Sequence, residues 1–234
     1  MKLAIMQPYL FPYIGYYQLI DAVDKFVNYD DVTYIKKGWI NRNNIQSHGE
    51  KYMFSIPIND ISSFRPINIT EINNRLYIVW RKKFLKTLHL NYCKSPFFEE
   101  GIRIVESVLD TTGNYISSIA FESIKQVCNY LKIETKLIET SEVYNNSQLS
   151  GKERVIDICK REEAEIYINP IGGQDLYDKN EFIQKGIKLY FLEPNVINYN
   201  QTNKEFIPNL SIIDVIMYNH PDKIQEYLKE YRLI

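Results

Sequence analysis

Short apolar runs alternate with amphipathic stretches along most of this chain. The run from Lys2 to Met6 predicts a buried strand, and Gln7-Pro8 ends it because proline donates no hydrogen bond to a sheet. Residues 13–23 carry apolar side chains at the spacing of one helix face, and residues 25–29 form a second apolar run. This succession of strand, helix and strand is the pattern of a right-handed βαβ unit.

The middle of the chain has a different pattern. Short alternating segments such as Tyr52 to Ile58 are typical of antiparallel strands with one exposed face, so we expect a small β-rich insertion over residues 32–72. Helical periodicity then runs through a segment at residues 74–131. Within it, three helices are predicted, near residues 74–90, 97–109 and 115–131.

The alternation of strands and helices returns after residue 131. Strands are predicted at residues 135–138, 165–169 and 187–192, and helices at residues 151–161, 180–185 and from Pro221 to near Arg232. Five strands separated by helices predict an α/β fold with a doubly wound, mostly parallel sheet. We expect residues 1–234 to form a single α/β domain.

Charge and hydropathy exclude several classes of function. The chain has 28 Lys and Arg residues against 29 Asp and Glu residues, whereas a general nucleic-acid-binding protein has a basic surplus. No apolar run approaches the roughly 18 residues of a membrane span, and the N-terminus lacks the apolar core of a signal peptide. We therefore expect a cytoplasmic protein with no nucleic-acid partner and no membrane span.

The cysteines and histidines do not lie at the spacings of a metal site. Cys93, Cys128 and Cys159 are far apart in the sequence, and none has a histidine at ligand spacing. We expect no metal and no disulfide framework, and we expect each cysteine to be a buried thiol rather than a nucleophile.

Candidate site residues follow the predicted strands, where open α/β sheets bind their ligands. The first cluster spans residues 6–16, in which two prolines and Gly15 restrict the backbone. Tyr13 and Tyr16 are candidate hydrogen-bond donors in catalysis, and Gln7, Pro8 and Tyr9 are candidate substrate-binding residues. The alternative is a rigid loop whose aromatic side chains only cover the core.

The second cluster joins Asp30 and Asp31 to the segment at residues 36–43. A carboxylate at a strand end can act as a general base or hold a substrate amine. In the segment, Lys36 and Arg42 are candidates to bind a diphosphate, and Trp39 is a candidate to stack on a base or sugar ring. Asn41 and Asn43 complete this group of substrate-binding candidates. The alternative is a turn whose charges are solvated.

The third and fourth clusters lie in the last third of the chain. Gly172 and Gly173 follow a predicted strand and can offer backbone N–H groups to an anion, although the motif is neither a Walker loop nor Gly-x-Gly-x-x-Gly. A plain tight turn is the alternative. Next to them are the catalytic candidate Asp175 and the binding candidates Gln174 and Tyr177. The fourth cluster, residues 198–201 and 206–214, combines amides with a helix start at which Ser211 and Asp214 would serve as cap and dipole partner.

Five motifs of the chain are specific in combination: Met6-Gln7-Pro8-Tyr9-x-Phe11-Pro12-Tyr13-x-Gly15-Tyr16, Tyr29-Asp30-Asp31, Gly38-Trp39-Ile40-Asn41-Arg42-Asn43, Gly172-Gly173 and Phe206-Ile207-Pro208-Asn209-Leu210-Ser211-Ile212-Ile213-Asp214. Together they resemble the WbqC-like family over essentially the whole chain. Members of that family typically lie in gene clusters for O-antigen and other surface polysaccharides. The resemblance implies a transferase of activated or amino sugars in that pathway, and it assigns no catalytic residue.

A weaker similarity is to the nucleotidyltransferase superfamily. Tyr13-Ile14-Gly15-Tyr16 stands where those enzymes carry a His-x-Gly-His phosphate-binding motif at the start of the first helix. Both histidines are tyrosines here, and a phenol cannot carry the positive charge that an imidazolium brings to a phosphate. The resemblance therefore implies a nucleotidyltransferase-like (HUP-type) sheet of order 3-2-1-4-5, with a changed reaction.

The function we expect is acyl or aminoacyl transfer that forms an amide on a nucleotide-linked amino sugar. Asp30 or Asp31 would be the base, and Tyr13, Tyr16 or the amides of Gly172 and Gly173 would hold the oxyanion. The acyl donor would be a thioester or an acyl adenylate, delivered by an acyl or aminoacyl carrier. Enzymes with this sheet can also join a carboxylate to an amine through an acyl adenylate, so the sequence leaves the use of ATP open.

Two alternatives belong to other classes. One is a nucleotidyltransferase that activates a sugar phosphate. The other is a non-catalytic binding or scaffold subunit of a glycan-assembly complex, which is favoured if the polar residues at the strand ends are buried and bound to one another. For the enzyme, we expect one cleft lined by six residues: Gln7, Tyr9, Asp30, Asp31, Arg42 and Asp175.

Overall fold

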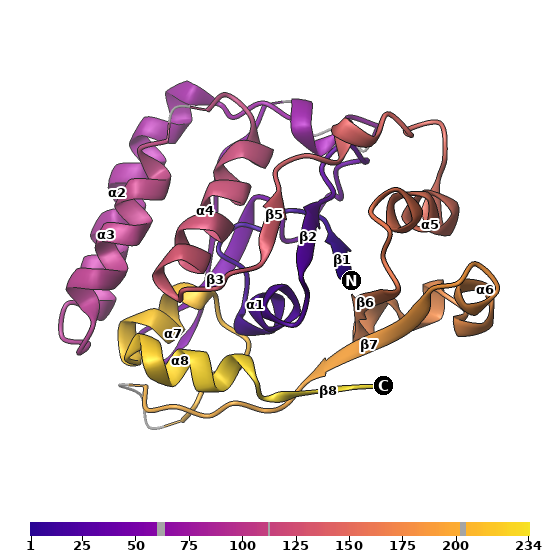
Figure 1. Cartoon of the computed structure of the whole chain (residues 1–234). Helices are drawn as coiled ribbons and strands as arrows, with labels where there is room; N and C mark the ends of the chain where they lie inside the picture. Colours follow the sequence, from indigo (N-terminus) through magenta and orange to yellow (C-terminus); the bar gives the residue numbers. More distant parts are fainter. Residues whose placement is uncertain (60–63, 112, 202–204) are drawn as a thin grey trace.

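A six-stranded sheet runs through the centre of the computed structural model, which describes residues 1–59, 64–111, 113–201 and 205–234 (Figure 1). In spatial order the strands are β5 (Lys136–Ile138), β2 (Lys25–Asn28), β1 (Lys2–Met6), β6 (Ile166–Pro170), β7 (Lys188–Pro194) and β8 (Tyr231–Leu233). The first five strands in this spatial order pair in parallel, and β8 pairs antiparallel with β7. The predicted α/β class, mostly parallel sheet and order 3-2-1-4-5 are confirmed.

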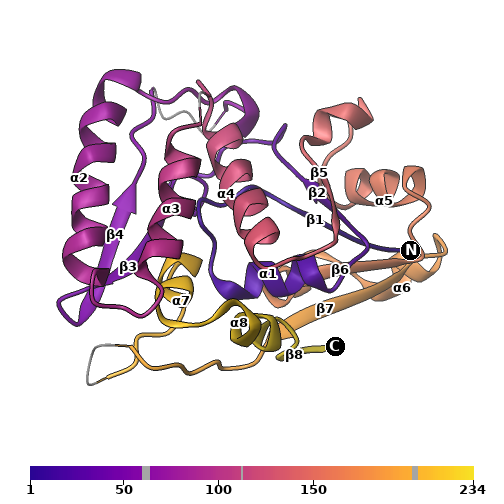
Figure 2. The ribbon, with the colours of Figure 1, turned by 60° about the vertical axis from the view of Figure 1, so that its left-hand side comes forward.

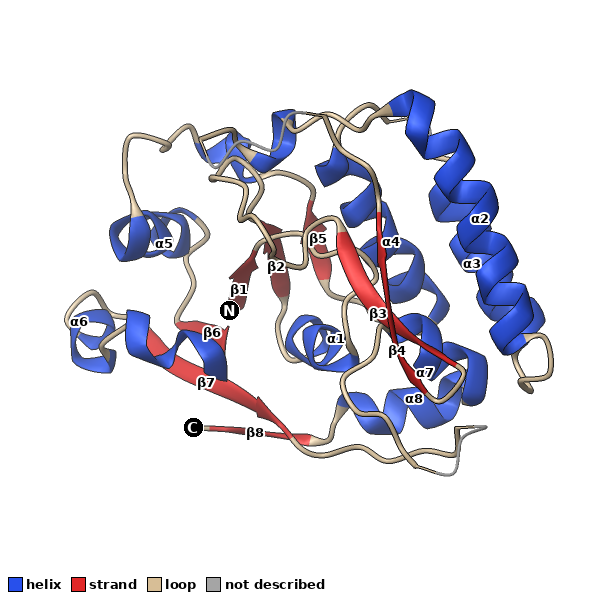
Figure 3. Cartoon of the chain, turned by 180° about the vertical axis from the view of Figure 1, so that it is seen from behind, coloured by secondary structure: helices blue, strands red, loops and turns tan. Residues whose placement is uncertain are grey.

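Helices cover both faces of this sheet. Successive side chains of a strand point to opposite faces, so Ala4 of β1 packs into one hydrophobic cluster while Leu3 and Ile5 pack into another. Figure 3 shows α5 and α6 on one side and α1, α4, α7 and α8 on the other. The helices begin and end as follows: α1 (Ile14–Asp21), α4 (Ile116–Tyr130), α5 (Gly151–Arg161), α6 (Lys179–Ile183), α7 (Ile212–Tyr218) and α8 (Pro221–Leu228).

The middle of the chain adds a hairpin and two long helices to this sheet. The strands β3 (Arg42–Ser47) and β4 (Glu50–Ser55) pair antiparallel in a sheet of their own, beside α2 (Asn74–Tyr92) and α3 (Phe98–Leu109) (Figure 2). Three short 3-10 helices also occur: η1 (Ile67–Ile69), η2 (Ser141–Tyr144) and η3 (Ile171–Leu176). Residues 60–63 of the predicted insertion and residue 112 of the predicted helical segment lie outside the described residues.

The end of the chain differs from the prediction. The last helix was expected to reach Arg232, but α8 ends at Leu228 and the chain then forms β8. Two backbone hydrogen bonds, of 3.0 and 2.9 Å, join Phe191 and Ile234 in both directions. Periodicity cannot show so short a strand, because its register depends on a partner about 40 residues away in the sequence.

The three cysteines do not share one environment. Cys128 and Cys159 are buried, and burial raises the pKa of each thiol to about 12. Cys93 is exposed, because it follows the last turn of α2. The prediction that each is a buried thiol is wrong for Cys93.

Candidate functional site

A cavity of about 650 Å³ lies over the carboxyl ends of β1, β6 and β7. In the sheet, β1 lies between β2 and β6. The chain adds β2 and β5 on one side of β1 and then returns to add β6 and β7 on the other side, so the strand order reverses between β1 and β6. This reversal is the place where open α/β sheets bind ligands. The described residues that line the cavity are Tyr9, Pro12, Tyr13, Ile14, Trp39, Asn43, Ile171, Glu193, Pro194, Asn195, Val196, Ile197, Tyr199, Phe206, Pro208, Asn209, Leu210 and Val215.

The cavity wall combines aromatic rings with amides and one carboxylate. Rings come from three parts of the chain: the loop after β1, the turn before β3 and the segment after β7. Asn43, Asn195 and Asn209 contribute amides, and Glu193 contributes the carboxylate, whose Oε2 accepts a hydrogen bond from Nε of Arg232 at 2.5 Å. None of the described lining residues is Lys, Arg or His. Such a wall suits a hydroxylated ring better than a phosphate.

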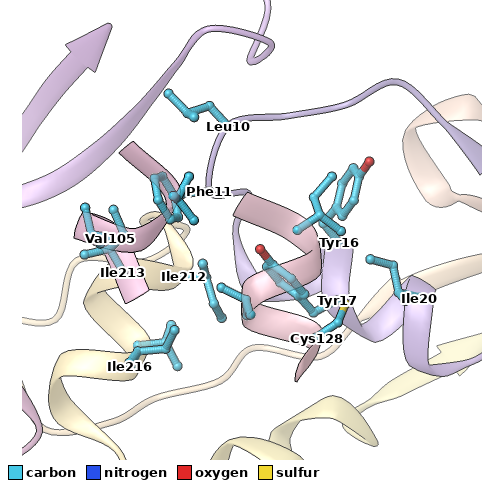
Figure 4. Packing of buried hydrophobic residues seen from close by; sticks show 14 of the residues in the cluster. Leu10, Phe11, Tyr16, Tyr17, Ile20, Val105, Cys128, Ile212, Ile213 and Ile216 are labelled. Carbon is cyan, nitrogen blue, oxygen red and sulfur yellow. The ribbon is translucent and has the colours of Figure 1, made fainter. Parts of the chain in front are cut away.

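The loop after β1 is held in one conformation by three distant segments. Phe11 has a positive φ of 42°, a conformation that is costly for a bulky residue unless its surroundings impose it. Its N–H donates to Oγ of Ser123 at 2.9 Å, and its carbonyl accepts hydrogen bonds from Nδ2 of Asn43 at 2.8 Å and Oγ of Ser211 at 2.7 Å. The phenyl ring lies near Ile213 of α7 in the core (Figure 4). The outer side of this loop, which lines the cavity, is therefore preorganised.

Tyr13 covers the start of α1. A Cβ atom added to Gly15 would lie only 2.4 Å from Cε2 of Tyr13, so the ring occupies the space that any larger residue would fill. Burial raises the pKa of the Tyr13 phenol, which therefore stays protonated and able to donate near neutral pH. Among the first cluster of candidates, Tyr9 and Tyr13 line the cavity.

Tyr16 points away from the cavity. Its ring is buried in the core, as Figure 4 shows, and its hydroxyl donates to the backbone carbonyl of Gln7 at 2.8 Å. Burial raises the pKa of this phenol well above its ordinary value. Tyr16 thus fixes the Gln7-Pro8 step rather than facing a ligand.

Asp30 is buried at the end of β2 and accepts hydrogen bonds at both carboxylate oxygens. Oδ1 accepts from Oγ1 of Thr140 at 2.7 Å and from the N–H of Ser141 at 3.2 Å, and Oδ2 accepts from Oγ of Ser117 at 2.7 Å. Burial raises the pKa of Asp30, while these hydrogen bonds oppose the rise. Asp30 lines a second, smaller cavity of about 320 Å³, together with Tyr115, Phe121 and Glu142 among others.

Asp31 forms an ion pair with Arg154 of α5. Its Oδ2 lies 2.5 Å from Nη2 of Arg154, and its Oδ1 accepts a short hydrogen bond from Oγ of Ser141. The guanidinium is almost completely buried, donates to Oδ1 of Asn146 at 2.9 Å and lies over the ring of Tyr29. The two acidic residues therefore connect β2 to the segments that follow β5.

The segment at residues 36–43 contributes unequally to the cavity. Trp39 and Asn43 line it, whereas Asn41 is buried and donates to the carbonyl of Ile56 at 2.8 Å. The guanidinium of Arg42 donates to the carbonyls of Gly38 and Lys37 and lies over the Trp39 ring, and Lys36 is exposed. Of the two candidates to bind a diphosphate, Arg42 is thus hydrogen-bonded to carbonyls of its own turn, while Lys36 faces solvent.

The paired glycines form part of the 3-10 helix η3. Gly173 packs against the side chain of Asn169, since a Cβ atom there would lie 1.9 Å from Nδ2. Gln174 and Asp175 are exposed, and Tyr177 packs edge-on against Tyr167 and Phe182 on the α6 side. Only the preceding residue, Ile171, is among the described residues that line the large cavity.

The prediction that six residues line one cleft is wrong. Tyr9 lines the large cavity and Asp30 the small one, while the lining of the large cavity includes neither Gln7 nor Asp31, Arg42 or Asp175. The physical reason is that the carboxyl edge of the sheet is wide: β2 and β5 end beside the small cavity, and β6 and β7 end beside the large one.

A buried carboxylate to which the sequence assigned only a role at a helix start lies behind the large cavity. Asp214 accepts hydrogen bonds from the hydroxyls of Tyr92 at 2.7 Å and Tyr199 at 2.6 Å, and from Nε2 of Gln201 at 2.8 Å. Burial raises the pKa of Asp214, and these donors oppose the rise. Ser211 caps α7 as expected, with Oγ accepting from the N–H of Ile213, and Asp214 lies in the first turn of α7, where it also holds the cavity-lining Tyr199. The neighbouring amides and phenol of residues 198–201 were the available signal.

The described residues contain neither a cluster of metal ligands nor a membrane-spanning helix. No group of three or more His, Cys, Asp or Glu side chains among them could hold a metal ion. Within the same residues, the helices are too short or too polar for one to cross a membrane.

Comparison with known proteins supports the resemblance seen in the sequence motifs. Residues 7–226 match the model of the WbqC-like protein family. The chain is also 27% identical, over 235 residues and 99% of each chain, to the uncharacterized protein Rv1507c of Mycobacterium tuberculosis. No solved structure matches it.

Proposed function

The chain belongs to the WbqC-like protein family, and from that premise we propose that it is a transferase of surface-polysaccharide biosynthesis, such as O-antigen biosynthesis. Membership of the family suggests a role in polysaccharide biosynthesis. The reaction that we propose is acyl or aminoacyl transfer, which forms an amide on a nucleotide-linked amino sugar.

The large cavity is the observation that carries this proposal. Aromatic walls pack against the apolar faces of a sugar ring, and amides and a carboxylate can bind its hydroxyls and its amine. The preorganised loop around Phe11 keeps Tyr9 and Tyr13 in place without an ordering cost on binding.

The chemistry requires a base for the substrate ammonium and a donor for the carbonyl oxygen. We assign the base to Glu193, the carboxylate among the described lining residues, and the donor to the protonated phenol of Tyr13. The amine nitrogen attacks the acyl carbonyl, its proton passes to Glu193, and the carbon–sulfur or carbon–oxygen bond to the leaving group breaks. Asp30 and Asp31 have no catalytic role in this scheme, because neither is among the described residues that line the large cavity.

A thermal-shift screen with nucleotide-linked sugars, with and without an amino group, tests binding. A ligand that binds only the native state raises the melting temperature, and we expect the amino sugars to give the larger shift. Mass spectrometry of the sugar after incubation with acyl thioesters tests catalysis. Glu193→Gln should keep binding and lose about 10²–10⁴-fold in rate. Asp175→Asn, at an exposed position outside the cavity lining, is the control.

A non-catalytic binding subunit is the second candidate. The observation that favours it is the complete engagement of Asp30 and Asp31, which are buried or half-buried and bound to Ser117, Ser141 and Arg154. It predicts stabilisation by a nucleotide sugar with no acylated product from any donor. No observation on the described lining residues favours the nucleotidyltransferase alternative.

A further inference from the structure

The outward face of α2 combines positive charge with exposed aliphatic side chains. The helix contains five Lys and Arg residues and no Asp or Glu, in a chain whose net charge is −1. Arg81 pairs with Asp110, and within the described residues no ion pair involves the exposed lysines Lys82, Lys83 and Lys86. Between these charges, Ile78 is 71% exposed and Leu90 is 70% exposed.

The opposite face of α2 anchors the helix to the protein. Tyr77, Trp80 and Phe84 stack on one another, with centroids 5.6 and 5.1 Å apart, and Phe84 stacks on Phe54 of the hairpin at 4.5 Å. Oδ1 of Asn73 caps the first turn by accepting from the N–H of Leu76. The outward face is therefore presented by a preformed helix at the edge of the molecule (Figure 2), and binding through it carries no cost of folding.

We propose that α2 binds the surface of an anionic lipid bilayer. Lysines interleaved with exposed aliphatic residues on a helix suit the boundary between anionic headgroups and acyl chains. A second copy of this chain would place the same positive face against itself, which like-charge repulsion disfavours. The neighbouring helix α3 carries Glu99, Glu100 and Glu106 against one arginine, so it does not extend the positive surface of α2. None of these residues is among the described lining of the strand-end cavity, and the proposal does not depend on its ligand.

Flotation of the full chain with lipid vesicles tests this proposal. We expect binding to mixed phosphatidylglycerol and phosphatidylcholine vesicles at low salt, no binding to phosphatidylcholine alone, and weakening as salt is added. Replacing Lys82, Lys83 and Lys86 together by Gln should weaken binding on the order of 100-fold. The matched control replaces Lys160, Lys185 and Lys188 and should bind like the wild type. These exposed lysines belong to α5, to the turn after α6 and to β7, elements that lie away from α2 on the other side of the molecule (Figure 1).

A second pair of substitutions separates a bilayer from another anionic partner. Ile78→Ser with Leu90→Ser keeps every charge but removes the aliphatic contribution, so vesicle binding should fall while retention on heparin does not change. Melting curves of each variant check that it is folded. The proposal is overturned if the wild type binds heparin but does not bind anionic vesicles. It is also overturned if the two lysine variants lose vesicle binding equally, or if the serine variant binds vesicles as the wild type does.

Discussion

Asp31 and Arg154, 123 residues apart in the sequence, form an ion pair of 2.5 Å beside the end of β2. Arg154 is almost completely buried, and its guanidinium also contacts Asn146 and the ring of Tyr29. A buried cation without a counter-charge destabilises the folded protein, because burial removes its hydration. This pair therefore ties α5 to the strand and explains an acidic residue that the sequence alone presents as a catalytic candidate.

Replacing one member of this pair should destabilise the protein strongly. Asp31→Asn leaves the buried guanidinium without a counter-charge, so we expect a loss of about 3–5 kcal/mol in the free energy of unfolding, measured by urea denaturation. Asp31→Leu with Arg154→Met removes both charges and should recover part of that loss. A loss below about 1 kcal/mol in Asp31→Asn would show that the pair has no structural importance.

The protonation of Asp30 should make stability depend on pH in a defined direction. Burial raises its pKa in the folded protein above the ordinary value of about 3.9 that it has when unfolded. Between these two values the folded state holds more protons, so the contribution of Asp30 to stability falls as the pH rises.

The comparison with Asp30→Asn isolates this effect, because Asp214 titrates in both proteins. We expect the stability of the wild type relative to the variant to decrease from about pH 4 up to the raised folded pKa and then to become constant. Urea denaturation at several pH values measures it. The opposite slope would mean that the hydrogen bonds to Asp30 outweigh its burial.

Gly15→Ala should affect ligand binding more than stability. The new Cβ atom would meet the Tyr13 ring at 2.4 Å, so the ring must move while the helix itself gains up to about 1 kcal/mol from the better helix former. We expect a melting temperature within a few degrees of the wild type and at least a tenfold loss of affinity for the nucleotide sugar found in the screen. Tyr13→Phe keeps the ring in place and serves as the control. Unchanged affinity in Gly15→Ala would remove Tyr13 from the site.

The two tyrosines that donate to Asp214 should differ in their importance for stability. Tyr199→Phe removes one of three donors to a buried carboxylate, which should cost about 1.5–3 kcal/mol. Tyr92→Phe removes a donor and also the oxygen that accepts from the N–H of Gln46 at 3.0 Å, so its cost should be about 1 kcal/mol larger. Chemical denaturation of both variants measures the difference. Equal losses would contradict the second role of Tyr92.

Ligand affinity should also distinguish these two variants, but with the larger effect in Tyr199→Phe. Tyr199 lines the cavity and Tyr92 does not, so only Tyr199→Phe should weaken binding of the nucleotide sugar per folded molecule. Equal affinities in both variants would mean that the Tyr199 hydroxyl does not help to shape the site.

The strand-end cavity was only partly predictable from the sequence. Among the predicted site residues, Tyr9, Tyr13, Trp39 and Asn43 line this cavity, in segments whose local composition marks loops that must hold an unusual conformation. Glu193 and residues 195–197 received no role from the sequence, and residues 198–201 and 206–214 were grouped as a candidate cluster without a ligand-binding role. Asp30 was predicted to face the same ligand, and the structure surrounds it with three hydroxyl or amide donors from the segments at residues 117 and 140–141.

The sequence by itself determined the class of the fold and most of its elements. Periodicity is a local property, and the strands β1, β2, β6 and β7 and the helices α2 to α5 each bury one face or stripe that a short window reveals. What only the tertiary structure decided is which polar groups satisfy one another. Asp30 meets Ser117, Asp31 meets Arg154, and Asp214 meets Tyr92 across separations of 87 to 123 residues. A carboxylate at a strand end looks the same in sequence whether it faces a ligand or a buried donor, because the partner is chosen by the packing of the whole chain.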